Sequence, residues 1–226
     1  MTVKIVAYTQ PVDFLETVGA AISPADQFIA YVARVSNPAN QGNNETSSKL
    51  LKYLVKNKHW SPFEMAHVTM EIETTRDIAR QILRHRSFSF QEFSQRYADP
   101  TKELGFKVRE ARLQDTKNRQ NSIEVEDRKL HYEWLDKQAE MIAKAQETYW
   151  WATENGIAKE QARAVLPEGL TVSRLYMAGS VRSWIHYCQL RMANGTQKEH
   201  REIASECWHE IVRIYPSLSE LIEISL

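Results

Sequence analysis

The stretch RHRSFSFQEFSQRY, residues 84–97, is the part of this chain that most constrains its fold and its chemistry. A solvated charge run would not carry three Phe residues, and a core strand would not carry Arg, Glu and Gln at this density. Side chains alternate in direction along an extended segment, so Phe88 and Phe90 are expected to face the core together. The opposite, polar side is free to line a site and carries Ser87, Ser89 and Gln91.

The segment 76–96 is basic although the whole chain has a formal net charge of zero. Its acids are Asp77 and Glu92, so five basic residues leave 5 − 2 = +3. Arginine suits a site in which a planar fork grips phosphate or carboxylate, or stacks on a ring, whereas ion pairing with acids elsewhere is the structural alternative. All five basic residues are arginines: Arg76, Arg80, Arg84, Arg86 and Arg96.

A second arginine cluster lies toward the C-terminus. Arg182 and His186 are four residues apart, so they share a face of the helix predicted there, and Arg191 lies further along it. Two arginine-rich segments in a chain with few glycines suggest ligands that combine anionic groups with planar rings. The cluster comprises Arg163, Arg174, Arg182, Arg191 and Arg201.

Composition limits the function classes. Zero net charge, from 29 basic and 29 acidic residues, argues against broad binding to nucleic acid or anionic membrane. No apolar run approaches the roughly 18 residues of a membrane span, and MTVKIVAYTQ lacks the apolar core of a signal peptide. Two cysteines imply no disulfide framework, so a reduced cytoplasmic protein is expected. The glycine-rich phosphate loops GxGxxG and GxxxxGK[ST] are absent.

Hydrophobic periodicity predicts a mixed chain with more helix than strand. Residues 98–124 are polar and irregular, which predicts an extended arm or loop. Strands are expected at 3–9, 67–75 and 169–179, and helices at 23–36, 45–58, 76–85, 125–154, 159–167, 180–192 and 197–216. The fold class is therefore α/β (α+β). We expect one helix-rich domain over residues 1–226, with a small, mostly antiparallel sheet flanked by helices.

The motif from Arg84-His85-Arg86 through Ser94, followed by Gln95-Arg96-Tyr97, resembles the signature of the flavin-dependent thymidylate synthases. At Gln91 the family's signature commonly has Asn. Glutamine keeps the amide and adds one methylene, so the contact should survive with a small shift. Further segments are similar to that family in the expected order: ARVSN (33–37), HWSPFE (59–64), QARAVLP (161–167), RSWIHYCQLR (182–191) and TQKEHREIA (196–204).

This resemblance implies conversion of dUMP to dTMP, with carbon from methylene-tetrahydrofolate and hydride from FAD that NADPH has reduced. It also implies a homotetramer with active sites at subunit interfaces, which would bring two arginine clusters into one pocket. The implied dUMP residues are Gln81, Arg84, Glu92, Ser94, Gln95, Arg96, Arg163 and Arg191. The implied FAD residues are His59, Ser61, Arg84, His85, Arg86, Gln91, Glu92, Ser180, Val181, Arg182 and His186.

Arg191 is the predicted catalytic residue. A uracil ring must become electron-rich before it attacks a methylene carbon, and a guanidinium at its imide edge favours the ionised form. Cys188, one helical turn before Arg191, offers nucleophilic activation as an alternative, although cysteine is commonly a small buried hydrophobe. Ser94 is interpreted as a hydrogen-bonding group for phosphate rather than a nucleophile.

Two alternatives come from other classes of protein. The pairs Glu64–His67 and Glu206–His209 have the E-x-x-H spacing of di-iron helix bundles, but the first pair runs directly into a strand. No metal is therefore predicted. A non-catalytic nucleic-acid binder could also use interleaved Arg and Phe, but zero net charge and the absence of Lys from segment 76–96 oppose it.

Overall fold

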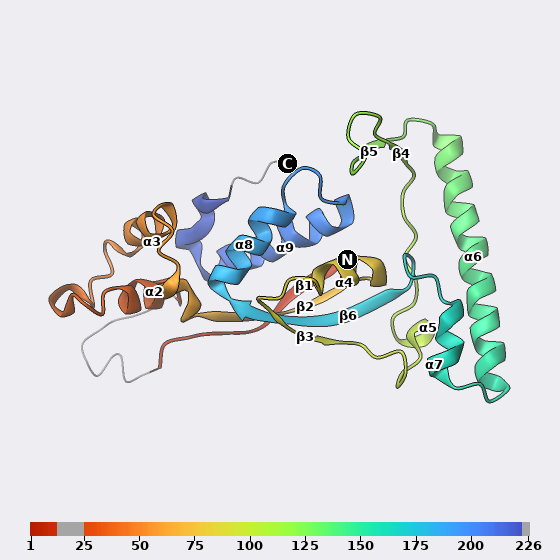
Figure 1. The fold of residues 1–226 in the computed structure, drawn as a ribbon, viewed down its shortest axis with the longest axis horizontal. Coiled ribbons are helices and arrows are strands. Elements are labelled where there is room, and N and C mark those ends of the chain that lie inside the picture. Colours follow the sequence, from red (N-terminus) through yellow and green to blue (C-terminus); the bar gives the residue numbers. More distant parts are fainter. Residues whose placement is uncertain (13–24, 223–226) are drawn as a thin grey trace.

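A computed structural model describes residues 1–12 and 25–222 (Figure 1). The strands are β1 (Thr2–Tyr8), β2 (His67–Thr75), β3 (Ser89–Glu92), β4 (Arg112–Gln114), β5 (Ser122–Glu124) and β6 (Val172–Ser180). The α-helices are α2 (Ala25–Ala33), α3 (Ser47–Lys56), α4 (Arg76–Ile82), α5 (Pro100–Glu103), α6 (Arg128–Glu154), α7 (Lys159–Ala162), α8 (Val181–Arg191) and α9 (Lys198–Ile214). Short 3₁₀ helices are η1 (Pro38–Asn40), η2 (Ser61–Glu64), η3 (Arg163–Val165) and η4 (Pro216–Leu221). The predicted α+β fold class is confirmed.

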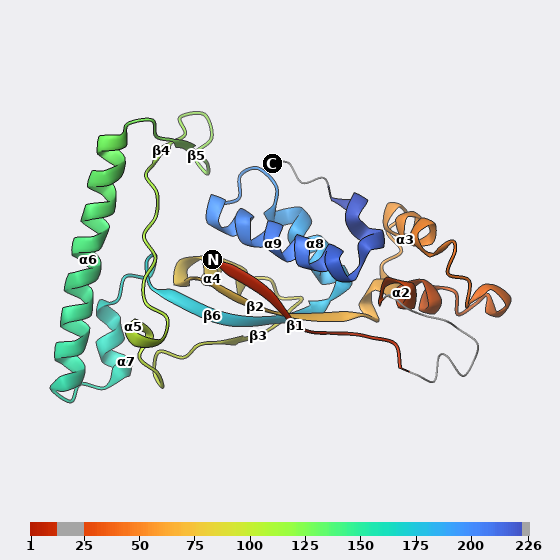
Figure 2. The same ribbon diagram turned by 180° about the vertical axis from the view of Figure 1, so that it is seen from behind.

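The main sheet has the strand order β1-β2-β6-β3 and is antiparallel throughout. Figures 1 and 2 show α4, α8 and α9 on one side of it. Apolar side chains of the two central strands point toward those helices, with Met70 opposite Met177 and Ile72 opposite Leu175. The strand predicted at 67–75 is therefore confirmed with its bounds.

The helices that cover the sheet carry the largest core side chains. Trp184 on α8 and Trp208 on α9 are both buried within the main core cluster. The Trp184 indole N–H donates to the carbonyl of Val68 at 3.1 Å, which satisfies its only polar atom and ties α8 to β2. The start of α8 is thus fixed to the sheet just after β6 ends.

Several predicted boundaries shift. The strand predicted at 169–179 begins at Val172, because the N–H groups of Leu170 and Thr171 both bond the carbonyl of Pro167 in a turn. The predicted helix 76–85 ends at Ile82. The predicted helix 159–167 is instead two short pieces, α7 and η3. The first two residues of the predicted helix 23–36 lie outside the described residues, and α2 ends at Ala33.

The arm predicted at 98–124 is more ordered than expected, since it contains α5 and the β4–β5 hairpin. Asp127 caps the next helix, α6, by accepting from the N–H groups of Lys129 and Leu130. Figures 1 and 2 both show α6 standing apart from the sheet. Most of its apolar side chains are accordingly exposed, including Leu130, Trp134, Met141 and Trp151.

No helix in residues 1–12 and 25–222 is both long and apolar enough to cross a bilayer.

Candidate functional site

The RHR turn, comprising Arg84, His85 and Arg86, connects α4 to β3. The N–H of Arg84 bonds the carbonyl of Gln81, and that of His85 bonds the carbonyl of Ile82, so the chain turns tightly once the helix ends. Gln81 therefore lies in the last turn of α4, whereas Arg84 lies just beyond its end. Both guanidinium groups of the turn are exposed and have no acidic partner in the described part of the chain.

β3 holds this turn in place, as the alternation predicted. Phe88 is buried against Trp184, with ring centroids 4.8 Å apart, whereas Ser89 and Gln91 on the other side are exposed. Ser183 donates through its hydroxyl to the carbonyl of Ser87 at 3.3 Å. The RHR turn is thereby fixed against the first turn of α8.

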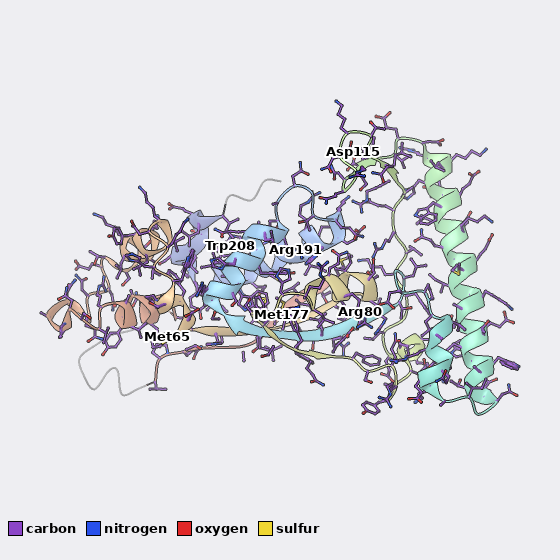
Figure 3. All side chains as sticks on the ribbon, viewed as in Figure 1. Met65, Arg80, Asp115, Met177, Arg191 and Trp208 are labelled. Carbon is purple, nitrogen blue, oxygen red and sulfur yellow. The ribbon has the colours of Figure 1, made fainter. Side chains whose placement is uncertain are left out.

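Arg191 at the end of α8 meets the RHR turn within one chain. Figure 3 labels Arg191 at this end of α8. Its Nε–H donates to Nε2 of His85 at 2.9 Å, and both side chains are half-buried. Burial, together with the charges of Arg191 and Arg84, lowers the pKa of His85 to about 4, so its ring is neutral and can accept this bond. One member of each arginine cluster, Arg84 and Arg191, thus lies beside His85 within a single chain.

Beside that pair runs a hydrogen-bonded chain that we call the buried relay: Tyr187, His200, Gln81 and Gln197. The Tyr187 hydroxyl and His200 Nε2 are 3.1 Å apart, and His200 Nδ1 is 3.1 Å from Gln81 Oε1. Gln81 Nε2 donates to Gln197 Oε1 at 2.9 Å. Only Gln81 was predicted as a site residue. The histidine in TQKEHREIA could have been a signal, because a His in the apolar-periodic face of a helix needs polar partners.

The predicted FAD residues form a second group around the start of α8. Arg182 Nη1 lies 2.5 Å from the Glu64 carboxylate on η2. The His186 ring stands edge-on to Trp60, 4.6 Å between centroids, and burial lowers the pKa of His186. Ser180 caps α8 by accepting from the N–H of Ser183. These contacts bring η2, which carries Ser61, and the nearby His59 close to the first turns of α8.

Val181 departs from the role predicted for it. Its side chain is buried and its N–H donates to the carbonyl of Ala66 at 2.8 Å. It positions the first turn of α8 and offers no free polar group to a ligand in this chain.

The remaining predicted nucleotide residues gather elsewhere, near α7. Arg96 pairs with Glu160 of α7 at 3.1 Å, and Arg163 follows on η3. Ser94 Oγ accepts from the N–H of Arg96 at 3.4 Å. Gln95 is buried, and its Nε2 has no hydrogen-bond partner in the described part of the chain. Figures 1 and 2 place α7 beside α6, away from α8.

The Glu92 side chain on β3 contacts residues of β6 and α4. It accepts from the Ser173 hydroxyl at 2.8 Å, and its two carboxylate oxygens lie 3.6 Å from Arg76 and Arg80 respectively. Arg76, Arg80 and Arg96 therefore each have a carboxylate partner, whereas Arg84 and Arg86 have none in the described residues.

The other chemistries considered from the sequence find little support in the geometry. Cys188 is fully buried, and burial raises its thiol pKa well above the usual range, so a thiolate nucleophile is disfavoured. Glu64 is paired with Arg182 rather than with His67. Within the described residues, no three His, Cys, Asp or Glu side chains are grouped so that they could hold a metal ion.

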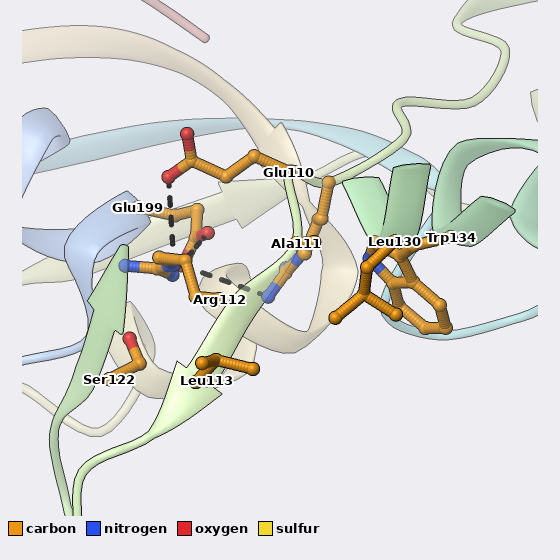
Figure 4. A pocket seen from close by; sticks show the side chains of 9 residues that line it. Glu110, Ala111, Arg112, Leu113, Ser122, Leu130, Trp134 and Glu199 are labelled. Atoms are coloured by element: carbon orange, nitrogen blue, oxygen red, sulfur yellow. Dashed lines mark hydrogen bonds and ion pairs between the residues drawn. The ribbon is translucent and has the colours of Figure 1, made fainter. Parts of the chain in front are cut away.

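A pocket of about 420 Å³ lies between the arm, α6 and α9, and none of the predicted site residues lines it (Figure 4). Arg112 pairs with Glu199 at 2.7 Å across it, while Leu113, Leu130 and Trp134 form an apolar wall. Its ion pairs bind the arm to α9, which is a structural role.

The predicted site residues suit a flavin dinucleotide and a nucleotide. FAD combines a diphosphate with two ring systems. The site offers unpaired guanidinium groups in the RHR turn, imidazoles of His59 and His186, and the capped N-terminus of α8. The orphaned amide of Gln95 provides a further buried donor without a partner in the described residues. The donor set therefore fits these ligands.

Comparisons with known proteins agree. A family model described as thymidylate synthase complementing protein matches residues 18–217. A probable flavin-dependent thymidylate synthase of Paramecium bursaria Chlorella virus 1 is 45% identical over 223 residues, covering 99% of each chain. The flavin-dependent thymidylate synthase of Synechocystis sp. is 47% identical over 223 residues, covering 99% of this chain and 100% of its own.

Among solved structures, the UMP/dUMP methylase PolB from Streptomyces cacaoi, bound with 5-Br dUMP, superposes with a TM-score of 0.78. It is 26% identical, and the match covers 96% of this chain and 91% of that one. Fold, site and relatives together define a flavin-dependent transferase that uses FAD. The chain belongs to the flavin-dependent thymidylate synthase family. The predicted family, enzyme class and flavin cofactor are thereby confirmed.

Proposed function

We propose that this protein methylates dUMP to dTMP, taking the carbon from methylene-tetrahydrofolate and using NADPH to reduce its FAD. The observation that carries the proposal is the contact between Arg191 and His85, which joins the RHR turn to the end of α8. That contact places a fixed guanidinium beside the RHR turn, whose two exposed arginines have no carboxylate partner in the described residues. Such a site favours a phosphorylated ligand whose ring acquires negative charge.

Arg191 is the proposed catalytic group. Its Nε–H is held by neutral His85, so the guanidinium plane is fixed and its Nη groups remain to meet the imide edge of uracil. Negative charge that develops there is stabilised without reorganisation of the protein. When bound, FAD supplies the hydride that completes the methyl group.

The remaining residues hold the ligands. We assign Arg84, Ser94, Gln95, Arg96 and Arg163 to the phosphate and sugar of dUMP, and Gln81 to its base or sugar. His59, Ser61, His85, Arg86, Gln91, Ser180, Arg182 and His186 are assigned to FAD. Glu92 is assigned to both ligands, and Val181 is proposed to act by fixing the start of α8.

We propose that the active enzyme is a cytoplasmic homotetramer in which residues 1–226 form one catalytic unit and sites are shared. The proposed dUMP residues fall into two groups, Gln81, Arg84 and Arg191 near α8, and Ser94, Gln95, Arg96 and Arg163 near α7. Figures 1 and 2 show α8 over the sheet and α7 beside α6, so we propose that neighbouring subunits bring the two groups together. The exposed apolar face of α6 also favours packing against other subunits.

The test is the visible spectrum of the purified protein before and after anaerobic addition of NADPH, followed by dUMP and methylene-tetrahydrofolate. We expect an oxidised flavin band that bleaches with NADPH and returns as dTMP forms. A colourless protein that cannot be reconstituted with FAD and instead binds oligonucleotides would support the nucleic-acid alternative.

A further inference from the structure

The buried relay has a fixed direction, and Tyr187 sets it. The Tyr187 side chain is only 1% exposed, and His200 is the single hydrogen-bond partner that its hydroxyl has in the described residues. A buried hydroxyl that cannot donate its proton carries an unsatisfied donor. Tyr187 therefore donates to His200 Nε2, which must be unprotonated.

The remaining bonds follow from that choice. His200 is fully buried, and burial, with the nearby charge of Arg191, lowers its pKa to about 3, so the ring is neutral. A neutral ring with a free Nε2 carries its proton on Nδ1 and donates it to Gln81 Oε1, 3.1 Å away. Gln81 Nε2 then donates one of its two protons to Gln197.

The relay leaves Gln81 with one defined function. Because Oε1 accepts from His200 and one N–H is used by Gln197, the second amide N–H of Gln81 is the donor that remains for a ligand. If the amide were turned by 180°, its N–H would face the protonated Nδ1 of His200, and two donors would meet. The amide of Gln81 is thus locked as a donor.

The same layer also supports Arg191. The His85 ring stands edge-on to Tyr187 with centroids 4.9 Å apart, and it lies 6.4 Å from the His200 ring. His85 in turn accepts from Arg191. Three rings from the RHR turn, α8 and α9 therefore fix the side chains of both Gln81 and Arg191.

We propose that His200 is a positioning residue, which acts through Gln81 to present an amide N–H to an acceptor atom of the nucleotide. This inference rests on the proposed function, because it requires dUMP to contact Gln81. His200 itself is buried and touches no ligand. Gln197 and Tyr187 are the further members of the relay that keep the amide in this orientation.

The experiment measures the dissociation constant of dUMP on the FAD-loaded protein by calorimetry. Loss of one positioning hydrogen bond should raise it about three- to tenfold in His200→Ala. His200→Asn should recover most of the affinity, since its amide N–H can replace Nδ1–H. The matched control is His209→Ala, which removes an exposed histidine from the same helix, α9, and should bind dUMP normally.

A double-mutant cycle decides whether His200 acts through Gln81. In a Gln81→Ala background, His200→Ala should change the dissociation constant of dUMP by less than twofold. An undiminished effect there, or normal dUMP affinity in folded His200→Ala, overturns the inference. If wild-type protein does not bind dUMP at all, the proposed function fails as well, so the two failures are distinguishable.

A readout independent of dUMP covers the case in which His200→Ala does not fold. ¹⁵N spectra of histidine-labelled wild-type protein should show His200 as the neutral Nδ1–H tautomer at pH 7. In Tyr187→Phe, which removes only the hydroxyl, the tautomer is no longer fixed and dUMP binding should weaken in the same direction. An Nε2–H tautomer in the wild type contradicts the relay.

Discussion

The Phe88 ring lies directly on the backbone of Gly179, where a Cβ would stand 2.4 Å from ring atom Cδ1. Gly179 is a buried residue of β6, and Phe88 is wedged between it and Trp184. The close approach lets β3 and the RHR turn lie against the sheet. A residue without a side chain is therefore required at this point of the sheet, because Phe88 has no free space to move into.

Gly179→Ala should destabilise the protein by about 1–3 kcal/mol, the usual cost of overpacking a core, and should weaken FAD retention by displacing the RHR turn. Gly169→Ala is the matched control, since the nearest atom to its added Cβ is 4.0 Å away. Thermal denaturation and the flavin content of each purified variant give the two readouts. Equal melting temperatures for the two variants would contradict the packing argument.

The alternation of Phe and Ser in residues 87–91 was sufficient to predict β3 and its buried side, because period 2 in a half-buried strand is a local property. The same holds for β2. The end of α4 was not predictable, because the i→i+3 bonds at Arg84 and His85 replace helical ones without any Gly or Pro to mark the change. The arm's hairpin was also missed, since its strands have three residues each and are too short for an alternation to be recognised.

For the candidate site, the sequence predicted which residues carry charge but not which of those charges are already paired. Arg84 and Arg76 have the same chemistry in sequence, yet only Arg76 lies beside the Glu92 carboxylate. The contact between Arg191 and His85 joins residues far apart in the chain, so no spacing rule predicts it. His200 was missed for the same reason.

The unpaired arginines of the RHR turn should be essential for FAD binding. Arg86→Ala removes a guanidinium that has no carboxylate partner in the described residues. The substitution should therefore weaken FAD binding without breaking an internal ion pair. We expect protein that purifies largely without flavin and regains little on incubation with FAD. Arg213→Ala, which removes an exposed arginine from the end of α9, should remain yellow. A fully flavinated Arg86→Ala would contradict the assignment.

Stability should fall as the pH is lowered through the histidine range. His200 has an ordinary pKa of 6.5 when unfolded and about 3 when folded, so the unfolded state binds more protons between these values. At pH 5 the difference amounts to at most about 2 kcal/mol for this fully buried ring. Below pH 3 the loss is complete.

Urea unfolding at pH 7 and pH 5, at one protein concentration, measures this loss. His200→Asn cannot titrate and should show a smaller decrease than the wild type between the two pH values. His85, whose pKa in the folded protein is about 4, accounts for part of the decrease in stability that remains in this variant. An identical decrease in His200→Asn would show that this ring does not stay neutral in the folded protein.

Sharing of sites between subunits should be visible in mixed tetramers. Arg191→Ala and Arg163→Ala each remove an arginine from a different group of dUMP residues. In a mixed tetramer, a site that takes each group from the subunit in which that group is unchanged has both arginines. If the subunits mix randomly, about a quarter of the sites are of this kind. Mixing Arg191→Ala with Arg84→Ala should restore nothing, because these two belong to one group of one chain. Activity is measured after the subunits re-anneal. A fully active monomer by light scattering would overturn the model.

Variants of Arg191 distinguish a role in binding dUMP from a role in the chemical step. A guanidinium that only anchored dUMP would raise KM when removed and would leave turnover at saturation largely intact. One that stabilises charge developing on the ring should lower kcat itself by about 10²–10³-fold, as is typical when an electrostatic donor is lost. Arg191→Lys keeps the charge but loses the planar fork and the Nε–H that His85 accepts, so it should restore only part of the rate.

The two half-reactions provide the internal control for Arg191. Reduction of bound flavin by NADPH does not involve ionisation of the uracil ring, so it should remain near normal in Arg191→Ala. Anaerobic stopped-flow on wild type, Arg191→Ala and Arg191→Lys measures flavin reduction and dTMP formation separately. If Arg191→Ala forms dTMP at the normal rate once dUMP is saturating, Arg191 is a binding residue only, and charge stabilisation on the ring must come from another group.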